Sequence, residues 1–308
     1  MSEHQGPTGR ELAARLGPVG VWSPHLQWQP AAKAREAVVE FERMEFGAVW
    51  VGEATGKEVL THASILLPAA SRIVVATGIA SIWARDPVAM ANGARTLAEA
   101  YPGRFVLGLG VSHPFLTEPR RRRYERPLNE MRAYLEAMDR APYVGPPVEA
   151  PLRVLAALGP KMLELARDRA AGAHPYFVPV EHTARARAIL GPEPFLAPEQ
   201  AVVLQRDSDR ARRLARRHMA SYLCLESYAR NLARLGWSED DLSGEGTDRL
   251  VDALVGWGDV DEVVARVRAH LDAGADHVAV RVLTEDPKQL PLSELRELAP
   301  AVAELGHP

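Results

Sequence analysis

The chain has 308 residues, of which 47% are hydrophobic and 25% are charged, and its formal net charge at pH 7 is -3. This is the composition of an ordinary globular protein with a sizeable core, and it gives no reason to expect nucleic acid or a membrane surface as a partner. No apolar run in the sequence approaches the length of a membrane span. Cys224 is the only cysteine, which excludes an internal disulfide and predicts a reducing, cytoplasmic location.

Apolar runs and helical periodicities alternate along the first half of the chain. Residues 1–16 are expected to form a lead-in or a short helix. Strands are predicted at residues 19–23, 48–53, 73–79 and 105–110, and helices at residues 30–46, 61–70 and 87–101. Asp86 and Pro87 form a capping and starting signal for the last of these helices.

The alternation continues more loosely in the second half. Strands are predicted at residues 153–158, 173–178, 195–204 and 277–283, and helices at residues 127–138, 182–190, 259–273 and 291–305, with another helix starting at residues 159–161. Residues 207–235 form a long basic helical region that is interrupted near residues 223–226. Residues 142–151 are rich in proline and glycine, and we expect a surface loop there rather than a domain linker.

Eight short buried strands, each followed by a helix, predict an α/β protein with a parallel sheet. Eight is also the number of strands that closes into a (β/α)8 barrel, and one such TIM-barrel domain can account for residues 1–308. A doubly wound open sheet is the alternative. Its dinucleotide-binding version is disfavoured, because Gly20-Val21-Trp22 at the first strand provides no glycine turn for a pyrophosphate.

The predicted strand at residues 105–110 is the most informative stretch. Gly108 and Gly110 point to the same face and leave it without side chains, which indicates that a ligand or another backbone comes close. Ser112 and His113 follow directly, before Pro114. A buried strand that ends in a hydroxyl and an imidazole is typical of active sites in barrel and doubly wound enzymes. The alternative is a core strand followed by an exposed loop histidine.

Polar side chains also follow the other predicted strands. They are Ser23, His25, Glu53, Thr77, Lys161, His174, Glu199, Gln200 and Arg281. This set is rich in proton donors and acceptors, and no Cys/His cluster has metal-ligand spacing, so we predict no metal site. A Ser-His-Asp hydrolase would use Ser112, but no nucleophile elbow surrounds that serine.

Three blocks, at residues 76–87, 104–114 and 156–160, resemble the luciferase-like flavin and deazaflavin oxidoreductases, specifically the branch that uses coenzyme F420. The resemblance covers nearly the whole chain, and residues 259–282 match in character. It implies a (β/α)8 barrel with insertions, assembled as a homodimer. It also implies hydride transfer between C5 of the deazaflavin and a small organic substrate that carries a carbonyl, an imine or an activated C=C bond.

The resemblance implies roles for individual residues. Gly78–Ile79 occupies the place of a non-proline cis peptide behind the deazaflavin ring, and His113 occupies the place of an acid or base that exchanges a proton with it. Glu53 stands where the family has an acidic residue beside the ring, although it could instead be a strand-end carboxylate paired with Lys57. Ala54 replaces the active-site histidine of a sugar-phosphate dehydrogenase of the family, so that mechanism cannot be transferred whole.

The anionic tail of coenzyme F420, a phosphodiester followed by glutamates, is expected at the helix start of Gly159 and Pro160, near Lys161. The arginine run at residues 120–123 could contact the same tail, or it could be a solvated surface run. The residues expected to contact the cofactor are Glu53, Thr77, Gly78, Ile79, Gly110, Ser112, Gly159, Pro160 and Lys161. Those expected to line the substrate pocket are Trp22, His25, Trp83 and Tyr176. The expected catalytic residues are His113 and Glu53.

Two alternatives stay open. One is an FMN-dependent, luciferase-like monooxygenase, in which the arginine run would have no cofactor role because FMN carries a single phosphate and no glutamate tail. The other is a catalytically silent relative that only binds flavin or F420. The identity of the substrate and the direction of hydride transfer do not follow from the sequence.

Overall fold

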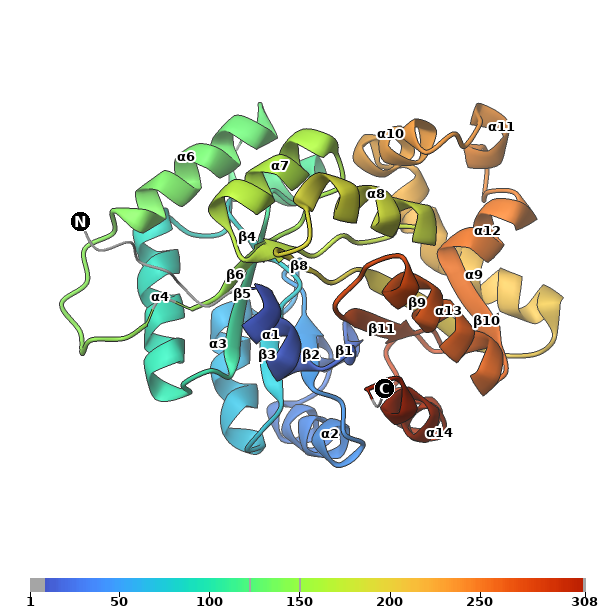
Figure 1. Cartoon of the computed structure of the whole chain (residues 1–308), viewed down its shortest axis with the longest axis horizontal. Coiled ribbons are helices and arrows are strands. Elements are labelled where there is room, and N and C mark those ends of the chain that lie inside the picture. The colour runs from blue at the N-terminus through green and yellow to red at the C-terminus, as the bar shows by residue number, and fades with distance from the viewer. Residues whose placement is uncertain (1–8, 122, 150, 307–308) are drawn as a thin grey trace.

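The computed structural model describes residues 9–121, 123–149 and 151–306. At its centre is a parallel sheet with helices packed around the outside (Figure 1). The strands follow the order β10-β9-β11-β1-β2-β3-β5-β6-β7-β8, and β4 pairs with β5. Their bounds are β1 Val19–Trp22, β2 Ala48–Val51, β3 Val74–Thr77, β4 Ala80–Ser81, β5 Phe105–Gly110, β6 Arg153–Leu155, β7 Gly172–Ala173, β8 Phe195–Leu196, β9 Glu199–Leu204, β10 Val255–Gly258 and β11 Val278–Val282.

The sheet closes on itself through residues 195–199, which join β8 to β9. On one side of this segment, the N–H of Ala197 donates to the carbonyl of Ala173 at 2.9 Å. On the other side, the N–H of Ala279 donates to the carbonyl of Pro198 at 2.9 Å. The sheet therefore closes between β8 and β9, with β10 outside the closed ring, and the predicted barrel is confirmed.

Helices connect successive strands and cover the outer face of the barrel. Their bounds are α1 Gly9–Leu16, α2 Ala31–Arg43, α3 Val59–Leu66, α4 Pro87–Ala100, α5 Pro114–Thr117, α6 Pro127–Asp139, α7 Pro160–Arg169, α8 Val180–Leu190, α9 Ser208–Leu223, α10 Glu226–Arg234, α11 Glu239–Leu242, α12 Asp248–Leu254, α13 Val260–Asp272 and α14 Leu292–Ala303. The sequence signals at their starts have the expected effect: the Asp86 carboxylate accepts N–H groups of the first turn of α4, and Asp259 and Glu262 form a capping box for α13.

The two faces of the sheet have separate cores, because side chains alternate along each strand. Val49, Val75 and Leu107 pack outward against the helices. Trp50, Ala76 and Val106 pack inward, in the centre of the barrel. The inner core also contains Leu12 and Leu16 of α1, and α1 contacts β8, so this helix closes the end of the barrel at which the strands begin.

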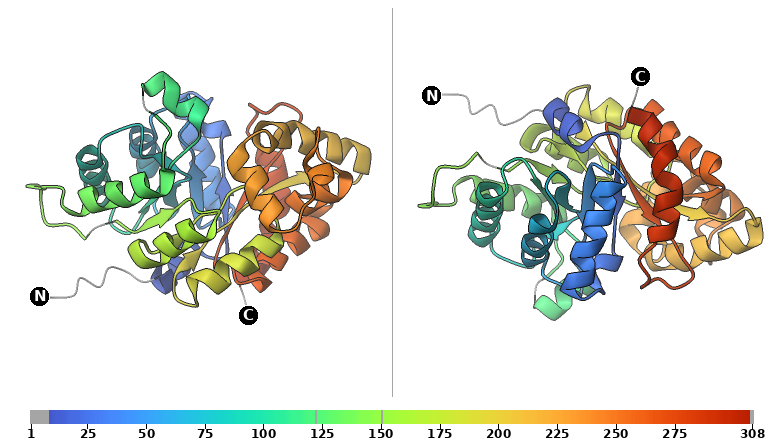
Figure 2. Two further views of the ribbon diagram at one scale, coloured as in Figure 1. Left: turned by 90° about the horizontal axis from the view of Figure 1, so that it is seen from above. Right: turned by 90° about the horizontal axis from the view of Figure 1, so that it is seen from below.

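Helices α9 to α12 and strand β10 form an insertion between β9 and β11. They gather on one side of the molecule, at the right of Figure 1 and of both views of Figure 2. The insertion has its own core, in which Leu214, Leu232 and Leu250 pack with Ala201 and Val203 of β9. The barrel and the insertion therefore share β9, which brings the insertion to the end of the barrel where the strands finish.

The predicted elements agree with the structure except in a few places. The predicted strand at residues 173–178 is wrong: β7 ends at Ala173, because Pro175 cannot continue a ladder. Pro198 likewise divides the predicted strand at residues 195–204 into β8 and β9. The short elements β4, β10, α5, α11 and α12 were not predicted. In the described part of the chain, no helix is long and apolar enough to cross a membrane.

Candidate active site

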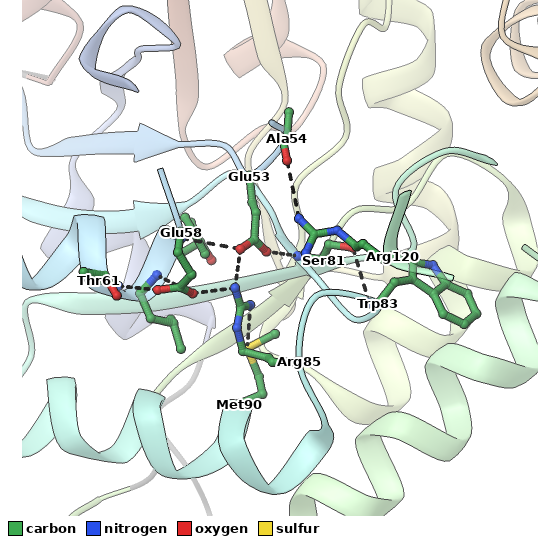
Figure 3. A network of polar contacts seen from close by, with 12 residues as sticks. Glu53, Ala54, Glu58, Thr61, Ser81, Trp83, Arg85, Met90 and Arg120 are labelled. Atoms are coloured by element: carbon green, nitrogen blue, oxygen red, sulfur yellow. Dashed lines mark hydrogen bonds and ion pairs between the residues drawn. The ribbon is translucent and has the colours of Figure 1, made fainter. Parts of the chain in front are cut away.

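Glu53 follows β2 and is fixed by a network of protein contacts (Figure 3). Its side chain is 3% exposed and pairs with Arg85 through Oε1. Its Oε2 accepts the N–H of Ser81 at 2.8 Å. Arg85 is shared with Glu58, which caps α3. Glu53 therefore ties the end of β2 to the segment that follows β3.

The alternative pairing of Glu53 with Lys57 is wrong. The Lys57 ammonium donates to the carbonyls of Leu26 and Gln29, at 3.0 and 2.7 Å. The partner of Glu53 is Arg85, which lies 32 positions further along the chain. Lys57 instead holds the loop that follows β1.

The segment after β3 contains the Gly78–Ile79 peptide bond, which is cis, as the family resemblance implied. It is held on the β2 side by two backbone hydrogen bonds, from the N–H of Gly78 to Val51 at 2.7 Å and from the N–H of Glu53 to Ile79 at 3.2 Å. The Thr77 hydroxyl donates to the carbonyl of Gly108 at 2.7 Å. The end of β3 is thus anchored to both neighbouring strands.

The glycines of β5 make room for this segment. A Cβ on Gly108 would lie 1.9 Å from the carbonyl oxygen of Thr77, and a Cβ on Gly110 would lie 2.6 Å from Cδ1 of Ile79. Close approach of another backbone is therefore confirmed for Gly108, whereas Gly110 makes room for the side chain of Ile79.

His113 lies just beyond β5, at the same end of the barrel. Ser112 has a φ of 55°, which turns the chain so that His113 becomes the N-cap residue of α5. The imidazole is stacked on Phe115 at 5.9 Å between ring centres and lies 5.4 Å from the ring of Tyr228. Burial lowers the pKa of His113 below its ordinary value of 6.5, so its ring is neutral at pH 7 and can accept a proton there. His113 is thus partly covered by an aromatic residue of the insertion.

A cluster of aromatic and charged side chains surrounds the end of β11. Arg281 lies over the indole ring of Trp22, with Cζ 5.0 Å from the ring centre. Its Nη1 donates to the hydroxyls of Tyr176 and Tyr222, and Tyr176 donates to Tyr222 at 2.8 Å. Arg281, Tyr176 and Tyr222 are all partly exposed, so this cluster lines the mouth of the barrel rather than its sealed interior.

Glu199 is the carboxylate of this cluster. Its side chain is buried, its Oε2 accepts the N–H of Phe177 at 3.4 Å, and its Oε1 has no partner among the described residues. Burial raises the pKa of Glu199 to about 7, although the charge of Arg281 and the N–H of Phe177 act in the opposite direction. Glu199 is therefore partly protonated near neutral pH.

Four ring nitrogens near the mouth are buried without a hydrogen-bond partner in the described part of the structure. They belong to Trp22 (Nε1), His25 (Nδ1), His174 (Nε2) and His218 (Nε2). Two of them adjoin Gly78, since a Cβ on that glycine would lie 2.6 Å from Trp22 Nε1 and 3.1 Å from His174 Nε2. Burial lowers the pKa of both His25 and His174 to about 4, so both rings are neutral at pH 7. Trp83, the other predicted pocket residue, is held by its indole N–H on the carbonyl of Val111 at 2.6 Å.

Helix α7 starts at the same end of the barrel, directly after β6. Gly159 is its N-cap residue, Pro160 its first residue, and no side chain caps its first turn. The cation next to Gly159 is Arg234 of α10, whose Nη1 would lie 3.0 Å from a Cβ on that glycine. Lys161 instead lines a hollow between α6 and α7 with Arg132 and Glu164.

Three residues of the arginine run at residues 120–123 can be located, because Arg122 lies outside the described residues. Arg120 reaches across to the loop after β2, where its Nη2 donates to the carbonyl of Ala54 at 3.4 Å (Figure 3). Arg121 and Arg123 are exposed, and Arg123 lies 3.9 Å from Glu125. The run follows β5 and therefore borders the same barrel mouth.

Residues 220–257 were expected to contribute to the specificity of the pocket, but sequence reasoning did not single out the residues that the insertion brings to this site, namely His218, Tyr222, Tyr228 and Arg234. The only signal for them is the interruption of the helical pattern between Tyr222 and Tyr228, where α9 ends and α10 begins. Glu199 and Arg281 were recognised as strand-end residues but were not assigned a role. In the described ranges, no group of three or more His, Cys, Asp or Glu side chains could hold a metal ion.

Comparison with known proteins adds three findings. A sequence model for luciferase-like monooxygenases matches residues 15–277. A Mycobacterium tuberculosis protein with the provisional name coenzyme F420-dependent oxidoreductase is 32% identical over 128 residues, which are 41% of this chain and 36% of that protein. The match thus spans about a third of this relative's length, and the same holds for a second, uncharacterised protein of Mycobacterium tuberculosis that is 33% identical over 110 residues.

Solved structures show the same fold at low sequence identity. The coenzyme F420-dependent tetrahydromethanopterin reductase from Methanopyrus kandleri superposes with a TM-score of 0.70 at 16% identity, covering 94% of this chain and 99% of that one. The oxygenating component of 3,6-diketocamphane monooxygenase from Pseudomonas putida, in complex with FMN, has a TM-score of 0.70 at 14% identity, covering 94% of this chain and 97% of that one. An F420-dependent secondary alcohol dehydrogenase has a TM-score of 0.67 at 15% identity, covering 92% and 98%.

Proposed function

The chain belongs to the family of luciferase-like monooxygenases, a family of oxidoreductases, and we propose that within it this protein is a coenzyme F420-dependent oxidoreductase. Its substrate would be a small organic molecule with a carbonyl, an imine or an activated C=C bond. Bound coenzyme F420 would supply or accept a hydride at C5 of its deazaflavin ring. The residues of this chain would bind and orient the cofactor and the substrate and would move the accompanying proton.

The observation that carries the choice of cofactor is the positive charge at the barrel mouth. Arg234 adjoins the uncapped start of α7 at Gly159, and a helix start with a neighbouring guanidinium favours a phosphate group. Arg120, Arg121 and Arg123 follow the neighbouring strand β5. Because parallel strands all end at the same side, these cations border one opening. They fit an anionic tail that is longer than the single phosphate of FMN.

The ring of the cofactor is expected at the ends of β1 and β3. Gly78 and Ile79 would contact one side of the ring, because the backbone of this segment is fixed by β2 and β5. The unpartnered nitrogens of Trp22 and His174 adjoin Gly78 and provide one N–H donor and one ring-nitrogen acceptor for polar ring atoms. Nδ1 of His174 lies 2.6 Å from the carbonyl oxygen of Ala197 and therefore carries the ring proton. Nε2 of the same ring is then unprotonated and can accept a hydrogen bond.

His113 would move the proton that accompanies hydride transfer. A neutral imidazole can take a proton through its free ring nitrogen, and its protonated form can return it. Phe115 and Tyr228 cover two sides of the ring and limit its contact with water. Glu53, which is fully engaged by Arg85 and Ser81, would act as a positioning residue for the end of β3 rather than as an acid or base.

Titration with the two cofactors tests this proposal. Both F420 and FMN fluoresce, so the anisotropy of each can be followed as the protein is added. We expect F420 to saturate at a protein concentration at least about tenfold lower than FMN, which corresponds to about 1.4 kcal/mol. Tight binding of FMN without a response from F420 would contradict the proposal and favour the FMN-dependent monooxygenase. Binding of F420 without turnover of any enone, imine or alcohol in a broad panel would favour the catalytically silent relative.

The family resemblance also supports a homodimer, which we propose as the state in solution. Sedimentation equilibrium at micromolar concentration tests this separately from the cofactor, with a mass of one chain as the contradicting result.

A further inference from the structure

Arg281 has a pair of unused donors at the barrel mouth. Its Nη1 is occupied by the hydroxyls of Tyr176 and Tyr222. Its Nε is buried and has no hydrogen-bond partner among the described residues. The hydrogen bonds of its guanidinium to described residues both use Nη1, so Nη2 is also available. Nε and Nη2 lie on the same edge of the planar guanidinium, and their N–H bonds point in parallel directions.

That edge is the one with which arginine binds a planar anion through two hydrogen bonds. The protein itself provides an example. Nε and Nη2 of Arg212 donate to the two oxygens of Asp252, at 3.0 and 2.6 Å. Arg281 offers the same two atoms, but no carboxylate of the described chain lies within 4 Å of its guanidinium.

The surroundings of Arg281 leave its positive charge without a fixed partner. The carboxylate whose charge acts on it is Glu199, and burial raises the pKa of Glu199 to about 7, so this group is partly neutral at physiological pH. The neighbouring rings of His25 and His218 are also neutral, because burial lowers their pKa values. Because Glu199 is only partly ionised, the net charge of the site lies between zero and +1, and one negative charge is the most that it can neutralise.

The walls of the site favour an organic anion. Trp22 lies against one face of the guanidinium, and its ring centre is 5.2 Å from that of Tyr176. Tyr222 accepts hydrogen bonds from both Arg281 and Tyr176, so its own proton is free to be donated to a ligand. A phosphate dianion would leave an excess negative charge beside these aromatic rings. A carboxylate matches the charge, the planarity and the two parallel donors.

We propose that Nε and Nη2 of Arg281 bind a carboxylate group of the substrate, so that the natural substrates are small organic acids. The inference rests on the proposed function for its reaction and deepens it by naming the substrate class. Tyr222 would donate a further hydrogen bond to the same carboxylate. Arg281 and Tyr222 would thereby decide which molecules the site accepts, while His113 would move the proton that accompanies hydride transfer.

Binding of matched pairs of acids and amides tests the proposal without any cofactor. The probes are acetate, crotonate and cinnamate, each compared with its neutral amide, and the readout is intrinsic tryptophan fluorescence, because Trp22 lies against Arg281. We expect the wild-type protein to bind at least one acid about tenfold or more tightly than its amide. If every acid binds no better than its amide, the proposal is wrong.

Three variants test whether the preference for the acid over its amide depends on Nε and Nη2 of Arg281. Arg281→Gln should abolish the preference for the acid, and Arg281→Lys, which keeps the charge but lacks the paired donors, should retain only part of it. Arg217→Gln is the control, because it removes one positive charge from an exposed arginine of α9 that pairs with Glu285; it should preserve the preference. An unchanged preference in Arg281→Gln would overturn the proposal. If Arg281→Gln does not fold, the wild-type comparison of acids and amides still decides.

One further outcome separates the substrate from the cofactor. If Arg281→Gln weakens binding of F420 tenfold while the acid preference persists, the guanidinium binds the cofactor ring and the proposal is wrong. Since the acids are tested on the protein without cofactor, a failure of F420 to bind would contradict the proposed function and leave the acid result standing. Conversely, equal binding of acids and amides would leave the F420 result standing.

Discussion

Nη1 of Arg281 donates to the hydroxyl of Tyr222 at 3.2 Å, and this hydrogen bond joins the last strand of the barrel to helix α9 of the insertion. Tyr222 lies in the last turn of α9, and Tyr228 lies in the first turn of α10. Tyr228 in turn lies 5.4 Å from His113. The insertion therefore completes the barrel mouth rather than decorating the outside of the fold, and the site consists of residues from both parts.

The first prediction concerns His113. If its imidazole moves the proton, His113→Ala should lower the rate of F420 turnover by about 100-fold or more, while the dissociation constant for F420 changes less than about threefold. The comparison of turnover with cofactor affinity separates proton transfer from binding. Phe115→Leu, which alters only the exposed ring stacked on His113, is the matched control and should retain most of the activity. Unchanged turnover in His113→Ala would remove this residue from the mechanism.

The second prediction concerns Glu53 and stability. Glu53→Gln should lower the free energy of unfolding by about 2 kcal/mol, because it leaves the mostly buried Arg85 paired only with the half-exposed Glu58. Glu58→Gln should cost about 1 kcal/mol or less, because Glu58 is half exposed and its ion pair is accessible to solvent. Urea unfolding of both variants measures the difference. Equal losses of stability in the two variants would show that the buried pair of Glu53 and Arg85 contributes no more to stability than the half-exposed pair of Glu58 and Arg85.

The third prediction concerns pH. Burial raises the pKa of Glu199 to about 7 in the folded chain, from an ordinary value of 4.5. The unfolded chain therefore loses this proton at lower pH than the folded chain, and the contribution of Glu199 to stability falls as the pH rises from 4.5 to about 7. The groups around it are Arg281 on β11, the Phe177 N–H, and Tyr176 and Tyr228, whose pKa values are raised by burial, so both tyrosines are neutral throughout this range.

Glu199→Gln should remove this dependence. Its stability relative to the wild type should increase by about 2–4 kcal/mol between pH 4.5 and pH 8. Thermal unfolding at both pH values measures the difference, and Glu193→Gln, at an exposed position, is the control for the loss of one carboxylate. Because wild type and variant share every other titrating group, their difference isolates Glu199. A difference that does not vary with pH would show that Glu199 ionises normally.

The fourth prediction concerns the cofactor tail. Arg234→Gln should weaken binding of F420 by about 3- to 10-fold, and the loss should shrink at high salt, because Arg234 is exposed and its interaction is screened. Lys161→Gln should have little effect, since Lys161 lies between α6 and α7. The reverse ranking would mean that the tail follows the outer side of α7 and does not contact the insertion.

The barrel was predictable because its strands are short apolar runs separated by amphipathic helices. The elements that were missed have weaker patterns: β10 contains two glycines in four residues, and β7 has only two residues before Pro175. The cis peptide was located through the family resemblance. His113 was already indicated by its place after a buried strand, and the resemblance added its role as an acid or base.

Long-range partners could not be predicted in the same way. Glu53 had two basic candidates, Lys57 nearby and Arg85 further along, and only the packing of the loops selects between them. The contacts of Arg234 with Gly159 and of Tyr222 with Arg281 depend on how the insertion packs against β9. No local pattern encodes that arrangement.

A crystal structure of the protein with bound coenzyme F420 tests the central claim most directly. We expect the deazaflavin ring to lie against Gly78 and Ile79 with His113 in contact, and the tail to follow Gly159 and Arg234. A ring bound anywhere else, or a site that takes up FMN and excludes F420 under the same conditions, would contradict it.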